Sequence, residues 1–155
     1  IAVTGVTADN VKAISDALTA AGVPASLFIE TKEVGLSGIT EKMLLTLQAN
    51  GFDIESAGHT GDDLRGLTDS QVTLELRQSR KILEDQLKKP VFAVAYPSGA
   101  TNDRVMGIAA DAGYLLGIAS GNSRTFGREQ LLNLPSIEIF SSMSAEEVSK
   151  MAAGS

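Results

Sequence analysis

Short apolar runs alternate along this chain with longer stretches in which apolar residues recur at helical spacing. Alternation at these lengths predicts parallel βα units, arranged either as a barrel or as an open doubly wound sheet. We expect the first four runs to be neighbouring parallel strands whose loops open on one face. The runs predicted as strands are Ile1–Thr4, Ala25–Ile29, Phe52–Ser56, Val91–Ala95, Leu115–Ile118 and Leu134–Phe140.

The stretches between these runs carry helix start and stop signals. We expect Asp9 to cap a helix that reaches Ala21, and a further helix to span Asn102–Ala112. The longest helix is predicted to begin at Thr68, which can form a capping box with Gln71. Its predicted buried stripe is Val72, Leu76, Leu83 and Leu87, and the side chains expected to face water are Arg80, Lys81 and Glu84.

Two further helices are predicted from their first turns. Thr40 is the expected cap of one, with Ile39 and Leu44 placed as a hydrophobic staple. Ser144 begins a last amphipathic stretch with the pattern of a second capping box. The segment 120–130, between the last two strands, is polar and is predicted to be a loop.

Composition narrows the class of protein. The 155 residues predict a single domain over 1–155, and 43% of them are hydrophobic. A net charge of −6 argues against a nucleic-acid partner, and no apolar run approaches the roughly 20 residues of a membrane-spanning helix, so we expect no membrane insertion. The chain has no cysteine, which excludes disulfides and thiolate ligands. Because it begins directly in a strand at Ile1, we expect a segment upstream.

Polar side chains gather where the predicted strands end, which is where ligands collect in parallel α/β folds. The candidate ligand-binding residues are Asp9, His59, Asp62, Asp63, Tyr96, Pro97 and Ser98. Simpler roles remain open for each: His59 as a solvated side chain, the two neighbouring aspartates as turn residues, Asp9 as a helix cap and Tyr96-Pro97 as a turn. Tyr96 could also offer a ring face to a sugar.

Several segments, in this order and spacing, resemble the NodB-type polysaccharide deacetylases. They are Ala21–Ile29 (Ala-Gly-Val-Pro-Ala-Ser-Leu-Phe-Ile), Ser79–Val91, Ala95–Val105, Asp111–Tyr114 and Leu134–Ile137. The resemblance implies a distorted (β/α) barrel, incomplete at this length. It also implies a zinc-type, metal-dependent hydrolase that removes acetyl groups from cell-envelope polysaccharides or chitin, and an exported or cell-envelope location.

The residues at the family's catalytic positions differ in this chain. The resemblance places Ala57 and Gly61 at the two histidine-ligand positions, with His59 between them, and the segment Thr4–Asn10 lacks the family's paired aspartates. Ala95 and Ser98 replace the arginine and tyrosine of the family's Arg-x-Pro-Tyr-Gly motif, and Ser136 replaces a later arginine. The family mechanism needs three histidines, whereas this chain has one, so it cannot proceed here as written.

We therefore predict a deacetylase-like domain that uses no metal cofactor and binds an N-acetylated or deacetylated polysaccharide, or a protein partner. The local acidity favours a neutral or weakly cationic ligand. One alternative is an active hydrolase with a rebuilt site that uses Asp9, His59, Asp62 or Asp63. Another is a purely structural domain. The sequence does not indicate an oligomeric state.

Overall fold

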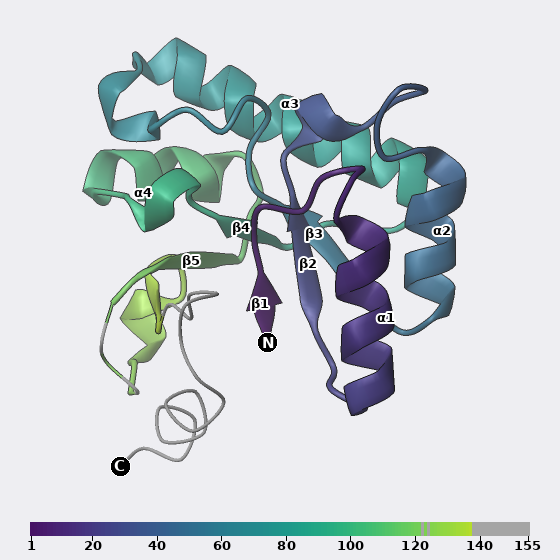
Figure 1. Ribbon diagram of the computed structural model, residues 1–155. Helices are drawn as coiled ribbons and strands as arrows, with labels where there is room; N and C mark the ends of the chain where they lie inside the picture. The colour runs from purple at the N-terminus through teal and green to yellow at the C-terminus, as the bar shows by residue number, and fades with distance from the viewer. Residues whose placement is uncertain (122, 124, 138–155) are drawn as a thin grey trace.

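The fold is built on one curled sheet of six parallel strands, ordered along the sheet as they are along the chain. The computed structural model describes residues 1–121, 123 and 125–137. The predicted parallel arrangement of the first four strands is confirmed, and the sheet forms an incomplete barrel (Figure 1). Its strands are β1 (Ala2–Val3), β2 (Ser26–Ile29), β3 (Asp53–Ser56), β4 (Ala93–Ala95), β5 (Leu116–Ser120) and β6 (Leu134–Ser136).

Within the described residues, four α-helices pack on the outer side of this sheet (Figure 1). They are α1 (Val11–Ala21), α2 (Glu41–Ala49), α3 (Asp69–Leu87) and α4 (Asp103–Asp111), and the short 3-10 helices are η1 (Thr31–Glu33), η2 (Leu64–Gly66), η3 (Pro97–Gly99) and η4 (Arg128–Gln130). The last of these lies in the segment that the sequence predicted as a loop. Among the described residues, no helix is long and apolar enough to cross a membrane.

The two faces of the strands carry different side chains. Leu27, Ile54 and Val94 belong to the main core between the sheet and the helices. Phe28 and Ala95 point to the other, inner face, where a small apolar cluster forms. Since successive strand residues alternate between faces, the strand sequence alone places these residues on opposite sides. The inner face is the one that a complete barrel would enclose.

The predicted helix starts are mostly confirmed. The Thr40 hydroxyl accepts a hydrogen bond from the Met43 amide at 3.3 Å, and Thr68 forms its capping box with Gln71. The four predicted stripe residues of α3 are all buried, as are Ile39 and Leu44. Strand and helix signals that act over a few residues therefore predicted these elements correctly.

Two predictions near helices are wrong. The N-cap position of α1 is Asn10 and not Asp9, because the helix begins at Val11. The Asn10 side chain makes no cap bond; it accepts from the Thr7 amide at 2.8 Å and donates to the Gly5 carbonyl at 2.9 Å. Arg80 does not simply face water, since its guanidinium donates to the carbonyls of Val91 and Ala112. The helix expected from Ser144 and the segment 138–140 of the last strand lie outside the described residues.

Candidate functional site

A cleft of about 850 Å³ opens on the inner face of the sheet, where the parallel strands end. Small apolar side chains form its floor, namely Ala57, Ala95 and Ile118. The residues that follow the strands form its walls, and they are Thr4 and Gly5 after β1, Glu30 after β2, the segment 96–99 after β4 and Ile137 after β6. The cleft therefore occupies the edge of the sheet where the sequence predicted a ligand site.

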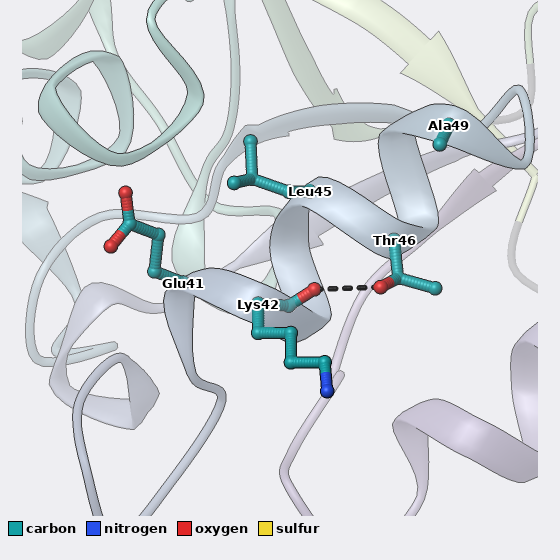
Figure 2. Close-up of a pocket in the computed structure, with 5 residues that line it drawn as sticks. All are labelled: Glu41, Lys42, Leu45, Thr46 and Ala49. Carbon is teal, nitrogen blue, oxygen red and sulfur yellow. Dashed lines mark hydrogen bonds between the residues drawn. The ribbon is translucent and has the colours of Figure 1, made fainter.

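A second hollow lies on the outer surface of α2 (Figure 2). Its five residues, Glu41, Lys42, Leu45, Thr46 and Ala49, come from that one helix and are all exposed. Thr46 uses its hydroxyl to donate to the Lys42 carbonyl at 2.7 Å, within the helix. A binding site normally draws polar groups together from several elements, so this shallow hollow is the weaker candidate.

His59 lies in the loop after β3 and is half-buried, with both ring nitrogens beside polar side chains. Its Nδ1 is 2.8 Å from the Thr31 hydroxyl, and its Nε2 is 3.4 Å from the Gln78 amide nitrogen. The interpretation of His59 as a merely solvated side chain is therefore wrong. Its ring connects η1 to α3 across the loop, and these contacts leave neither nitrogen free to bind a metal without breaking them.

The Glu75 carboxylate on α3 fixes the same loop. It accepts hydrogen bonds from the amides of His59 and Thr60 at 3.0 and 2.9 Å and from the Thr60 hydroxyl at 3.0 Å. The Lys32 ammonium holds the other side of the loop by donating to the Thr60 carbonyl at 2.6 Å. Charged side chains thus form hydrogen bonds with backbone amides and a carbonyl of this loop, which would otherwise bond to water.

The three aspartates proposed as ligands are exposed and do not line the cleft within the described part of the chain. Asp63 caps η2 by accepting from the Arg65 amide, and the Arg65 side chain lowers the pKa of Asp63 to about 2. Asp62 accepts from the Thr60 hydroxyl at 3.0 Å. These contacts match the simpler reading of both residues as part of the turn before Thr68.

The segment after β4 does reach the cleft. Tyr96 is only 3% exposed and its hydroxyl donates to the Leu132 carbonyl at 2.8 Å, so its ring forms part of the wall and is not an open stacking surface. Burial raises the pKa of Tyr96 to about 12. Pro97 is buried, whereas Ser98 is exposed at the cleft with a φ of 55°.

Glu30 is the site residue that the sequence reading missed. It follows β2 directly and is the only charged side chain among the residues that line the cleft in the described part of the chain. Its carboxylate pairs with the Lys32 ammonium at 2.7 Å. The rule that ligand residues follow strand ends would have found it, because it stands at the same position after β2 as Ala57 does after β3.

The Glu30 carboxylate also fills the space next to Gly61. A Cβ added at Gly61 would lie 2.7 Å from the carboxylate carbon and from both of its oxygens. The two positions that the resemblance equates with metal ligands, Ala57 and Gly61, therefore hold no donor, and the space beside the second is occupied. The described residues contain no group of three or more His, Cys, Asp or Glu side chains able to hold a metal. This donor set does not fit zinc.

A second carboxylate lies on the inner face of the sheet, outside the residues that line the cleft. Glu55 in β3 is 6% exposed, pairs in register with Phe28 and accepts from the amides of Phe92 and Ala93 at 2.9 and 2.8 Å. Burial raises its pKa to about 7, outweighing the backbone hydrogen bonds that favour the ionised form.

Comparisons with known proteins agree on one family. The family model described as polysaccharide deacetylase matches residues 4–117. YxkH of Bacillus subtilis, a provisionally named polysaccharide deacetylase, is 29% identical over 115 residues. That match covers 72% of this chain and 40% of YxkH, so the chain spans well under half of this relative's length.

Two solved structures share the fold. The deacetylase PplD of Streptococcus pyogenes, in complex with acetate, superposes with a TM-score of 0.87 at 24% identity, over 97% of this chain and 68% of that one. A CE4 family pseudoenzyme from Bacillus anthracis superposes with a TM-score of 0.65 at 17% identity, over 76% of this chain and 41% of that one. With the family model matching most of its length and its fold shared with these structures, the chain belongs to the polysaccharide deacetylase family.

Proposed function

We propose that this domain binds a polysaccharide in the cleft at the strand ends and does not deacetylate it by a metal-dependent route. The observation that carries this proposal is the absence of side-chain donors at Ala57 and Gly61, the two positions that correspond to the family's metal ligands. Ala57 has no donor atom, and the space beside Gly61 is filled by the Glu30 carboxylate, which is already paired with Lys32. A divalent cation placed there would meet the positive charge of Lys32 and find too few ligands.

The cleft keeps features that suit a glycan. It opens along the strand ends, with hydroxyl groups on its rim and an apolar floor on which a sugar ring face can rest. The rim hydroxyls that support this proposal belong to Thr4, Ser98 and Ser136. Because the buried Tyr96 offers no open ring, we propose contact with the ring face through aliphatic side chains such as Ile118.

Two further points support the proposal. A structural neighbour in Bacillus anthracis is itself described as a CE4 family pseudoenzyme, so loss of activity on this fold has a precedent. Family membership also supports an exported or cell-envelope location, which forms part of the proposal. A hydrolase rebuilt from Asp9, His59, Asp62 or Asp63 is less well supported, since these side chains do not line the cleft among the described residues.

Calorimetric titration with chitin and peptidoglycan fragments, combined with an acetate-release assay, tests the proposal. We expect the unaltered protein to bind at least one fragment and to release no acetate. Thr4→Trp places a bulky ring in the cleft and should abolish binding, whereas Thr46→Trp fills the hollow on α2 and should not. Acetate release that disappears in His59→Ala would establish the rebuilt hydrolase instead. Loss of binding only in Thr46→Trp would move the site to α2.

A further inference from the structure

Glu30 is the only charged side chain among the described residues that line the cleft, and its partner Lys32 lies outside that lining. The other described residues of the lining are glycines or have apolar or hydroxyl side chains. The phenol of Tyr96 is the only ionisable side chain among them. About a third of the Glu30 side chain, 30%, is exposed, so a ligand in the cleft can reach it. A carboxylate in this position distinguishes ligands by charge, because hydrogen bonds between charged partners are stronger than those between neutral ones.

The Glu30 carboxylate has acceptor capacity left. Its Oε2 pairs with Lys32 at 2.7 Å, while its Oε1 has no hydrogen-bond partner among the described residues. Lys32 makes a second bond, to the Thr60 carbonyl at 2.6 Å, and is not among the residues that line the cleft. An ionised carboxylate can accept about four hydrogen bonds, so a second cation can bind without displacing the first.

Gly61 is what permits this placement. The carboxylate lies 2.7 Å from where a Cβ would stand, so any other residue at position 61 would push Glu30 out of its place. The glycine that removes a metal donor from the loop thus makes room for a carboxylate at the same point. The missing donor at position 61 and the placement of the Glu30 carboxylate beside it therefore belong to one altered site.

We infer that Glu30 makes the cleft selective for a polysaccharide that carries free amino groups over the same polysaccharide in its acetylated form. This inference rests on the proposed function, since it assumes that a glycan occupies the cleft. A protonated sugar amine supplies the positive charge and the N–H donors that the open Oε1 accepts. An acetamido group at the same place is neutral and has a single N–H donor, so its bond to the carboxylate is weaker.

Titration with chitotetraose and with its fully deacetylated form, at matched pH and salt, tests this selectivity. We expect the unaltered protein to bind the deacetylated tetramer roughly five- to tenfold more tightly. Glu30→Gln keeps the size of the side chain and removes its charge, so the ratio of the two dissociation constants should fall to about one. Raising the salt concentration should reduce the ratio in the unaltered protein only.

Lys32→Met should change the selectivity in the direction opposite to Glu30→Gln. Removing the competing cation leaves the Glu30 charge unopposed, so the preference for the deacetylated tetramer should increase. If the Glu30–Lys32 pair only stabilised the loop, both variants would weaken binding of both tetramers to a similar extent. Thermal unfolding of each variant checks that the fold is retained.

The outcomes separate this inference from the function on which it rests. Equal binding of the two tetramers, or tighter binding of the acetylated one, overturns the selectivity while leaving glycan binding in place. A ratio that Glu30→Gln does not change overturns the assignment to Glu30. Absence of binding to either tetramer and to the fragments used above overturns the proposed function and this inference together.

Discussion

Gly61 has a backbone conformation that other residues rarely adopt, with a φ of +83°, and it lies against the Glu30 carboxylate. The φ restricts this position to glycine, and a Cβ would in addition displace the carboxylate at the end of the Glu30 side chain. The neighbouring Gly66 is free of both restrictions, because a Cβ there would meet nothing within 4 Å and its φ is not positive. The two glycines form a matched pair on one loop.

Replacing Gly61 with alanine should therefore lower the free energy of unfolding by roughly 1–3 kcal/mol, from backbone strain and the displaced carboxylate. Gly66→Ala should change it by no more than about 0.5 kcal/mol. Urea unfolding of both variants measures the difference. Equal effects of the two substitutions would mean that Gly61 is not held in this conformation in solution.

Glu55 predicts a pH dependence of stability. Its pKa of about 7 in the folded protein is above its ordinary value of 4.5, so between these values the folded state holds a proton that the unfolded state has lost. The free energy of unfolding should thus fall as pH rises from 4.5 to 7, by up to about 3 kcal/mol, and level off above. Glu55→Gln should remove this fall, whereas Glu41→Gln on the exposed surface of α2 should leave it unchanged. Urea unfolding at several pH values measures this dependence, and a slope that persisted in Glu55→Gln would contradict the assignment.

At the scale of elements, charged side chains join helices to the loops that frame the cleft. Arg104 on α4 donates to the carbonyls of Leu64, Arg65 and Leu67 and pairs with Asp69 at 2.7 Å. These carbonyls belong to η2 and the residue after it, just before α3 begins. One guanidinium therefore supplies donors to carbonyls at the end of a short helix, of which that of Leu64 also accepts from the Leu67 amide.

Arg104→Ala should lower the free energy of unfolding by roughly 1–3 kcal/mol, because it leaves three carbonyls without this donor. Arg77→Ala is the matched control: Arg77 is exposed and makes one long hydrogen bond of 3.4 Å to the Asp111 carbonyl. That change should stay within about 0.5 kcal/mol. Thermal or urea unfolding compares the two, and similar losses would contradict a special role for Arg104.

At the scale of the whole molecule, the six strands form an open, curled sheet. Its cleft is lined by residues in or next to each of these strands. In such a fold, one metal ion could bind to loops from several strands and hold them together. Here the loop after β3 is instead held by Glu75 and Lys32, which bond to it directly, and by the ring of its own His59, which bonds to Thr31. The side chains supply the connections that a metal would otherwise make.

A chelator should therefore leave the protein unchanged. We expect protein purified without chelator to contain no near-stoichiometric zinc, cobalt or nickel, and its melting temperature to be the same with and without EDTA. Elemental analysis and thermal unfolding measure this. Near-stoichiometric metal that is lost in His59→Ala would contradict the prediction and support a rebuilt metal site.

The sequence by itself determined the elements and their order. Caps such as Thr40 and Thr68 act within one turn of a helix, and the alternation of strand residues sets their two faces, so both can be read from neighbouring residues. The family likewise followed from segments that keep their order and spacing. The loss of side-chain donors at Ala57 and Gly61 was visible for the same reason, since it depends only on which residues are present.

Only the tertiary structure decided what the site residues do. His59 meets Thr31 and Gln78, which are distant from it in sequence, and Glu30 reaches the space beside Gly61 because β2 and β3 are neighbours in register. Tyr96 turns into the wall because the Leu132 carbonyl, 36 positions further along the chain, accepts its hydroxyl. The partner that a side chain meets depends on such distant contacts, and local pattern carries no information about that partner.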